Sequence, residues 1–342
     1  MSSEFTIISH DRKPLRDMLP LGKPLSIFIE PTNLCNFRCT PCVHGSENTR
    51  NDLKPLRHME MSLYEKLIRE LQEWEGPRLK LLRLAMLGEP FVNPEFCEMV
   101  RLAKEANIAE RVDTFSNGSL LTDESAAKLI KYGLDAIRFS IYAAEDRHHQ
   151  EVTKTRLSVE TIRANIKGLR EMRDAQGEKT PHIFVKMFDT YSEENDKFFE
   201  LYQDIADEIG LEKVHNATRY SGNDLVKMYY HDRDKEGRAN QEYVDGLNKD
   251  RIACSRPFMA MVINNIGDCL MCTHDPAKGT KIGNACENTL RELWNGEDMF
   301  QFRKMLLENR KHENRICTNC DWFKLFPEED NVDGFPVEKM RS

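Results

Sequence analysis

Three cysteines with the spacing C-x3-C-x2-C lie within eight residues, at Cys35, Cys39 and Cys42. Thiolates are the usual protein ligands of iron–sulfur clusters, and three on one short loop can hold three corners of a 4Fe–4S cubane. The fourth iron then keeps a coordination position that a cofactor or substrate can take. The spacing therefore indicates a cluster that takes part in a reaction by binding a cofactor or substrate, because clusters that only transfer electrons usually have four cysteine ligands.

A structural zinc site is the alternative for this loop. Zinc prefers C-x2-C pairs that further Cys or His ligands complete, and His44 lies two residues after Cys42, where it can be a fourth ligand. The C-x3-C-x2-C run does not consist of two such pairs. We therefore favour the iron–sulfur cluster and keep zinc as the alternative.

A second group of cysteines lies near the other end of the chain. Four of them have a spacing that can enclose a further cluster: Cys254, Cys272, Cys317 and Cys320. An expected hairpin brings Cys272 back toward Cys254, and the C-x2-C pair supplies two adjacent corners. Cys269 can replace Cys272 in this set. Four ligands leave no iron open, so the natural role of this cluster is electron transfer.

Strands alternate with helices between residues 25 and 218, which predicts βα units around a parallel sheet. The expected strands are 25–32, 79–87, 111–115, 135–142, 182–188 and 211–216, separated by helices 59–73, 94–105, 123–132, 159–173 and 194–209. Right-handed connections curl such strands toward a barrel. The predicted fold class is α/β: a partial (βα)6 TIM-like barrel, followed by a small hairpin-plus-helix iron–sulfur module.

Short polar motifs fall at the C-terminal ends of these strands, where βα barrels carry their active sites. The cysteine loop follows the first strand, Gly88-Glu89-Pro90 the second, Ser116-Asn117-Gly118 the third and Ser140 the fourth. Their shared position at one rim predicts that they form one site.

The cysteine loop and the rim motifs together resemble the radical S-adenosylmethionine (SAM) superfamily. In that family the open iron binds SAM, and cleavage of SAM gives a 5′-deoxyadenosyl radical that abstracts hydrogen from a substrate. The resemblance implies that SAM contacts these residues: Gly88, Glu89, Ser116, Asn117, Ser140 and Lys154. Two positions depart from the family pattern, since Pro41 replaces a frequent aromatic residue and Leu87 replaces the first glycine of a Gly-Gly-Glu motif.

Residues 254–323 resemble the twitch or SPASM auxiliary-cluster modules of that superfamily, most nearly the single-cluster form of an aminocyclitol dehydrogenase. The resemblance implies SAM and two 4Fe–4S clusters as cofactors, and a flavodoxin- or ferredoxin-type electron donor. A second auxiliary cluster would need more than the six cysteines between 254 and 320. One auxiliary cluster is therefore favoured, and two stay an alternative.

Such an enzyme can oxidise a secondary alcohol, because a carbon radical makes its neighbouring hydroxyl acidic and the auxiliary cluster can accept the remaining electron. We expect a small polyol or amino-sugar substrate, such as a sugar or aminocyclitol, with Arg238 as a substrate contact. Epimerisation is the first alternative, with Cys286 or Cys269 as the hydrogen donor. Peptide modification is the second; only 34 residues precede Cys35, fewer than we expect for a leader-binding domain.

The composition of the chain narrows the functional classes to which the protein can belong. A net charge of −8 argues against a nucleic-acid surface, and we expect no membrane span and no export signal. Ten cysteines without such a signal predict metal binding in a reducing cytoplasm. The expected divisions are an arm (1–24), the barrel (25–218), a linker (219–253), the auxiliary module (254–323) and a loosely held tail (324–342).

Overall fold

A single sheet organises the chain. The computed structural model describes residues 13–216, 222, 224–231 and 233–341. The strand order is β6-β5-β4-β3-β2-β1-β7-β8-β9, and β1 to β7 pair in parallel whereas β8 and β9 are antiparallel. The strands are β1 (Ser26–Ile29), β2 (Leu81–Arg83), β3 (Val112–Ser116), β4 (Ala136–Ile141), β5 (His182–Phe188), β6 (Glu208–Glu212), β7 (Ala260–Ile263), β8 (Asp268–Leu270) and β9 (Lys281–Asn284). This linear order makes a curled, open sheet rather than a closed barrel.

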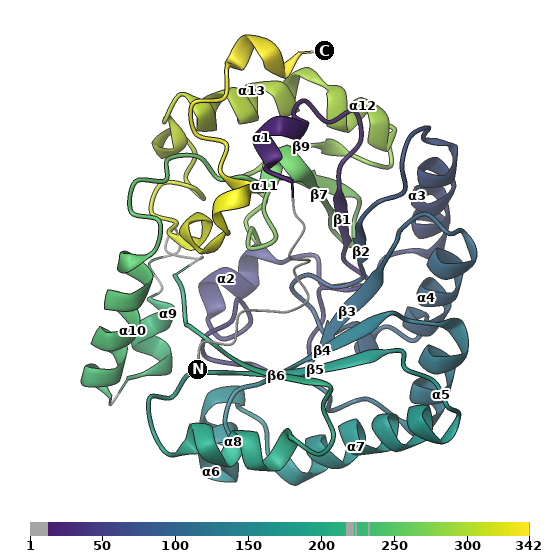
Figure 1. The fold of residues 1–342 in the computed structure, drawn as a ribbon, viewed down its shortest axis with the longest axis vertical. Helices are drawn as coiled ribbons and strands as arrows, with labels where there is room; N and C mark the ends of the chain where they lie inside the picture. The colour runs from purple at the N-terminus through teal and green to yellow at the C-terminus, as the bar shows by residue number, and fades with distance from the viewer. Residues whose placement is uncertain (1–12, 217–221, 223, 232, 342) are drawn as a thin grey trace.

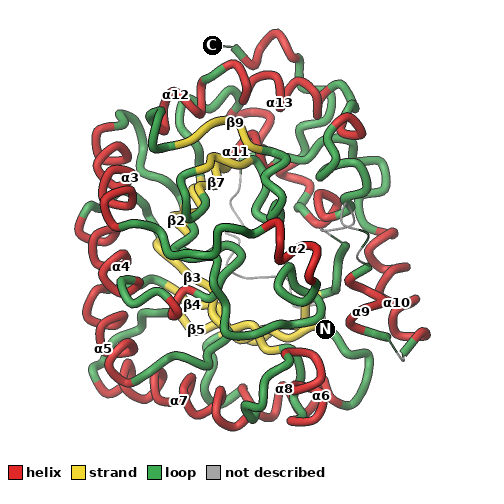
Figure 2. The backbone as a smooth tube through the Cα atoms, turned by 180° about the vertical axis from the view of Figure 1, so that it is seen from behind, coloured by secondary structure: helices red, strands yellow, loops and turns green. Residues whose placement is uncertain are grey.

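Helices cover the outer side of this sheet (Figure 1). The α-helices are α1 (Leu15–Met18), α2 (Glu47–Asp52), α3 (Met61–Glu73), α4 (Phe96–Glu105), α5 (Asp123–Tyr132), α6 (Asp146–Thr153), α7 (Val159–Ala175), α8 (Glu194–Tyr202), α9 (Leu225–Tyr229), α10 (Asp234–Gly246), α11 (Arg256–Met259), α12 (Leu290–Asn295) and α13 (Glu297–Leu307). The outer layer runs from α3 through α4 and α5 to α7, while α2 lies over the opening in both views (Figure 2).

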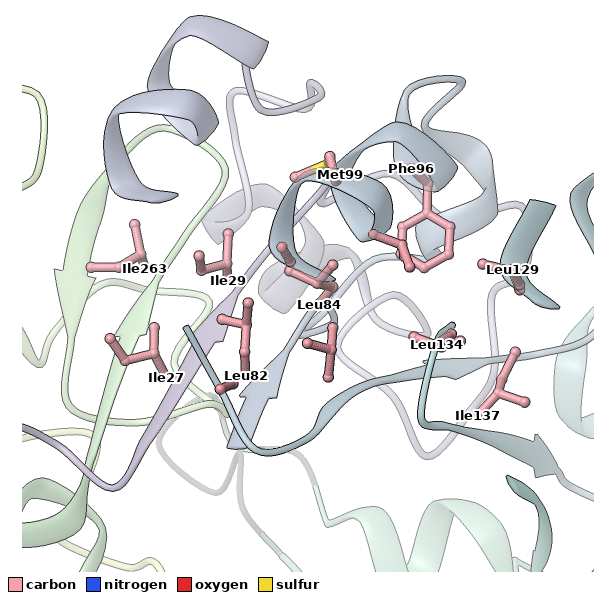
Figure 3. Packing of buried hydrophobic residues seen from close by; sticks show 14 of the residues in the cluster. Ile27, Ile29, Leu82, Leu84, Phe96, Met99, Leu129, Leu134, Ile137 and Ile263 are labelled. Carbon is pink, nitrogen blue, oxygen red and sulfur yellow. The ribbon is translucent and has the colours of Figure 1, made fainter. Parts of the chain in front are cut away.

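The two faces of the sheet differ in chemistry. Successive side chains of a strand point to opposite faces. Ile27 of β1, Leu82 of β2 and Ile137 of β4 point outward and pack with Met99 of α4 and Leu129 of α5 (Figure 3). The alternate positions of the same strands therefore face the interior, where charged and aromatic side chains gather.

The predicted α/β fold with a partial barrel of parallel strands is confirmed, but the last unit is wrong. The helix expected over 194–209 ends at Tyr202, and the strand expected over 211–216 is β6, Glu208–Glu212. Gly210 pairs with Lys186 of β5, in the middle of the strand. Gly210, which lies between the expected helix and the expected strand, is therefore a strand residue.

Two other expectations are corrected. The linker, expected to be irregular, contains α9 and α10. Asn240 anchors α10 to the barrel, because its side chain accepts from the N–H of Val214 and donates to the carbonyl oxygen of Val214. The tail expected to be loosely held packs into a core, where Val332 is fully buried. Residues 1–12 of the expected arm, and 217–221, 223 and 232 around the linker, lie outside the described residues. The domain boundaries stay a prediction, although β7 of the auxiliary module continues the sheet from β1.

Candidate active site and metal centres

The cysteine loop follows β1 at the C-terminal edge of the parallel strands. The end of α6 fixes it: the N–H of Arg38 donates to the carbonyl oxygen of Thr153 at 3.0 Å, and that of Thr40 to Val152 at 2.8 Å. Gly45 completes the turn after Cys42, because a Cβ there would lie 2.3 Å from the carbonyl oxygen of Cys39. Sequence reasoning missed this glycine, although a glycine so near a cysteine loop is a recognisable turn signal.

The three thiols of this loop are close enough to affect one another. Burial, and then Cys42, raise the pKa of Cys35 to about 12, and burial with Cys42 and Cys35 raises that of Cys39. Buried thiols that repel one another are readily deprotonated only when a metal takes up their charge. This donor set therefore fits a metal cluster.

The second and third rim motifs join beside the cysteine loop. A Cβ at Gly88 would lie 2.1 Å from the carbonyl oxygen of Thr32, so the close approach requires glycine. Glu89 accepts hydrogen bonds from Ser116 Oγ at 2.8 Å and from the N–H of Asn117 at 2.7 Å. Burial raises the pKa of Glu89 to about 7. A carboxylate held in this way can receive an ammonium group.

Other predicted SAM contacts are less constrained. Ser140 is partly exposed on β4, and Lys154 is exposed at the end of α6, with a left-handed φ of 56°. His44, the candidate zinc ligand, is buried, and its Nε2 lies 3.1 Å from the carbonyl oxygen of Leu87. Hence its ring supports the second rim motif.

The second cysteine set also comes together. After burial, Cys254 and Cys320 raise the pKa of Cys317, while Cys320 and Cys317 raise that of Cys272. Cys269 is fully buried on β8 within the main hydrophobic core. The placement thus favours Cys272 over Cys269 as the remaining ligand, and the ligand assignment stays a prediction.

The structure does not bring the two predicted catalytic side chains into these groups. Cys286 is exposed, with its Sγ 4.0 Å from the carbonyl oxygen of Ile266 in the β7–β8 turn. Arg238 is exposed on α10, which lies at the margin of the molecule (Figure 1).

Within the described residues, no group of three or more His, Cys, Asp or Glu side chains has the spacing of a site for a single metal ion.

Comparison with known proteins decides the family. The radical SAM superfamily profile matches residues 29–205, more than half of the chain. The chain belongs to the radical SAM superfamily. An iron-sulfur cluster-binding SPASM domain matches residues 254–321, which contain the second cysteine set. The cofactors of this radical SAM enzyme are therefore SAM and 4Fe–4S clusters, one of them auxiliary. No helix in the described part of the chain has the length and apolar character of a membrane span.

Two curated relatives match part of this radical SAM enzyme. It is 31% identical over 162 residues to the tungsten-containing aldehyde ferredoxin oxidoreductase cofactor-modifying protein of Pyrococcus furiosus, covering 47% of this chain and 42% of that one. It is 26% identical over 113 residues to the SAM-dependent 2-deoxy-scyllo-inosamine dehydrogenase of Niallia circulans, covering 32% and 45%. The chain spans less than half the length of either relative.

Solved structures share the fold at low sequence identity. BtrN in complex with AdoMet and 2-DOIA has a TM-score of 0.53 at 17% identity, covering 87% of this chain and 93% of that one. SuiB of Streptococcus suis bound to SAM has a TM-score of 0.62 at 15% identity, covering 94% and 79%. These likenesses support the architecture of the radical SAM enzyme and leave its substrate open.

Sequence reasoning did not single out Glu30, whose carboxylate links β1 to both of its neighbouring strands. Its Oε1 accepts from the N–H of Leu87 at 3.0 Å, and its Oε2 accepts from the N–H of Asn265 at 3.3 Å. It thereby joins the ends of β1, β2 and β7. A lone carboxylate that ends an apolar strand just before the cysteine loop was the available signal.

We predict that Glu30 makes stability depend on pH. Burial raises the pKa of this carboxyl from 4.5 to about 7, so its protonated form is favoured in the folded chain. The protonated Glu30 carboxyl therefore contributes to the free energy of unfolding. This contribution is complete below pH 4.5 and is lost as pH rises through 7. From about pH 6 to about pH 8, the unfolding free energy should fall by ~1 kcal/mol more in wild type than in Glu30→Gln. Denaturant titrations that give parallel pH curves for the two proteins would contradict this.

Proposed function

We propose that this radical SAM enzyme oxidises a secondary alcohol of a small polyol, aminocyclitol or amino sugar to a ketone. Cys35, Cys39 and Cys42 would hold the cluster that, with SAM, would supply a 5′-deoxyadenosyl radical, and the second cysteine set would hold the cluster that would take up one electron. The substrate loses a hydrogen atom from carbon to that radical, a proton from its hydroxyl to a base and one electron, so that C–H and O–H bonds are exchanged for a C=O bond.

One observation carries this proposal. The set Cys254, Cys272, Cys317 and Cys320 offers a cluster four thiolates, and a closed cluster exchanges electrons rather than binding a substrate. The relation to a SAM-dependent 2-deoxy-scyllo-inosamine dehydrogenase supports the same reaction class.

The protein's own contribution is to hold the reacting groups in one space. Glu89, Ser116 and Asn117 form a rigid hydrogen-bonded unit for the amino-acid end of SAM, while Gly88 lets the backbone approach the cysteine loop. Lys186 on β5 acts electrostatically on Cys39, so the interior face of the sheet lies next to that loop. A substrate between the two cysteine sets would contact this face.

Arg238 stays our prediction for a substrate contact, and Cys286 for a hydrogen donor if the reaction is epimerisation. Their exposed positions give neither role support, which makes Arg238→Ala and Cys286→Ala useful variants in the assay below.

The test is an anaerobic assay of reconstituted enzyme with SAM, a reductant and a panel of polyols and amino sugars. Oxidation predicts 5′-deoxyadenosine together with a product lighter by two hydrogens. A product whose mass is unchanged in ordinary water but gains one deuterium in D2O, and which is lost in Cys286→Ala, would replace oxidation by epimerisation.

A further inference from the structure

A group of charged and aromatic side chains connects the two cysteine sets through the interior of the sheet. We call it the basic cluster, and its members are Arg138, Lys186, Glu212, His215, Arg256, His274 and Trp322. At one end, the charge of Lys186 lies within electrostatic reach of Cys39 and Cys42. At the other end, Arg256 follows Cys254 by two residues, as do His274 and Trp322 after Cys272 and Cys320.

The barrel half of the basic cluster is built on three neighbouring strands. Glu212 of β6 lies 2.9 Å from Arg138 Nη1 of β4 and 2.5 Å from Lys186 Nζ of β5. Burial raises the pKa of Glu212, but Arg138 and then Lys186 outweigh it and lower that pKa to about 2. The carboxylate is therefore ionised and shared by two cations. The guanidinium of Arg138 also lies 3.7 Å from the ring centre of Phe115, which orients it.

The auxiliary half continues through ring contacts. His215 stacks on Trp322 with centroids 6.0 Å apart, and His274 meets Trp322 edge-on at 4.4 Å. The guanidinium of Arg256 lies 4.6 Å from the Trp322 ring and 4.8 Å from the Phe28 ring. Burial lowers the pKa of His215 to about 4, so this histidine is neutral near pH 7.

The basic cluster has more positive than negative charge. Arg138 and Lys186 share one carboxylate, Glu212, with Asp113 as a further acidic neighbour of Arg138. Asp330 acts on Arg256 electrostatically, but no salt bridge within 4.0 Å joins Arg256 to a carboxylate among the described residues. The buried Nε atoms of Arg138 and Arg256 also have no hydrogen-bond acceptor there. Arg138 nevertheless keeps 25% of its side chain accessible on the interior face. Buried cations with free donors are expected to meet an anion.

We propose that the basic cluster binds an anionic group of the substrate, so that the polyol oxidised here carries a phosphate or a carboxylate. The inference rests on the proposed function for the identity of the polyol. Guanidinium and ammonium groups bind both anions through charge-assisted hydrogen bonds, and Arg138 presents a planar fork for them. A free amino group on the substrate, by contrast, would meet like charge.

Two other roles for the same cations are separable by experiment. They can offset the negative charge of the clusters, in which case their loss lowers iron content. They can instead bind the carboxylate of SAM, in which case their loss weakens SAM binding. Arg138 is the informative position because Glu212, Arg83 and Asp113 dominate its charged surroundings, rather than the cysteines.

The test compares four probes with one ring and different charges: glucose 6-phosphate, glucuronate, glucose and glucosamine. Anaerobic holoenzyme with SAM and no reductant is titrated calorimetrically, so that binding is measured without turnover. We expect the two anions to bind roughly tenfold to a hundredfold more tightly than glucose, and glucosamine no more tightly than glucose. Ketone formation in the separate assay tests the reaction, so the two proposals can fail independently.

Arg138→Met should lose roughly tenfold or more in affinity for the anionic probes and leave glucose unchanged. Arg138→Lys should retain most of the preference, and Arg101→Met, on the exposed side of α4, should retain all of it. Equal binding of glucose or glucosamine, or no saturable binding of either anion below about 10 mM, overturns the proposal. A fall in iron content or SAM affinity in Arg138→Met, with probe preference unchanged, also overturns it.

Discussion

Replacing Cys39 by alanine should abolish 5′-deoxyadenosine formation, a fall of roughly a thousandfold or more, because a missing ligand removes the cluster and not merely one contact. Cys39 is the most buried of the three thiols in its loop, and its neighbours Cys35 and Cys42 act on its pKa directly. No other cysteine of the described chain takes part in that group of mutual effects. Two thiolates alone hold a cubane poorly in a site that leaves one iron open.

The same variant should keep its auxiliary cluster. Iron content should fall from about eight to about four per chain, since each cubane holds four irons. Cys97→Ala is the matched control, because Cys97 lies on α4 away from both sets. Full 5′-deoxyadenosine formation by Cys39→Ala, or loss of all eight irons, would contradict the separation of the two centres.

Replacing Cys317 and Cys320 together by alanine should have the opposite effect: SAM cleavage should persist and ketone formation should be lost. The pair supplies two of the four thiolates of the second set, and the N–H of Cys320 donates to the carbonyl oxygen of Cys317 at 3.3 Å. Without this cluster the substrate has no electron acceptor after hydrogen abstraction. Ketone yield should fall roughly a hundredfold or more, while SAM is still cleaved to 5′-deoxyadenosine at a comparable rate.

A substrate deuterated at the reacting carbon distinguishes loss of the electron acceptor from unfolding of the double variant. Hydrogen abstraction does not need the auxiliary cluster, so the double variant should still transfer deuterium from the substrate carbon to 5′-deoxyadenosine. The substrate radical, which cannot be oxidised, can then regain hydrogen. An undiminished ketone yield would defeat the role of electron acceptor. Loss of both 5′-deoxyadenosine and ketone, with intact iron in the first set, would show that the auxiliary module is needed to build the site.

The cysteine loop and its rim partners were predictable because their signal is local. Cys35, Cys39 and Cys42 carry their spacing in eight residues. Glu89 follows one strand that alternation reveals, and Ser116 ends another. Parallel strands bring such ends to one edge whatever the details of packing. The helices beginning at Asp123 and Val159 were also predictable, because their caps are encoded by neighbouring residues.

The charged interior was not predictable from the same patterns. Arg83, Arg138 and Lys186 occupy alternate strand positions, and alternation alone does not say whether the polar side faces solvent or an enclosed space. Their meaning depends on residues distant in sequence, such as Glu212 beside Arg138 and Phe28 beside Arg256. The pairing of β7 with β1 is likewise a contact between segments more than 200 residues apart, which no local pattern encodes.

Electron paramagnetic resonance of the anaerobic, reduced holoenzyme, recorded with and without SAM, tests whether SAM binds the cluster of the first cysteine loop. We expect two 4Fe–4S signals, of which SAM shifts only the one that disappears in Cys39→Ala. The signal that disappears when Cys317 and Cys320 are replaced should be unaffected by SAM. A SAM-insensitive spectrum, or a shift confined to the cluster that depends on Cys317 and Cys320, would contradict the assignment of the open iron to the first cysteine loop.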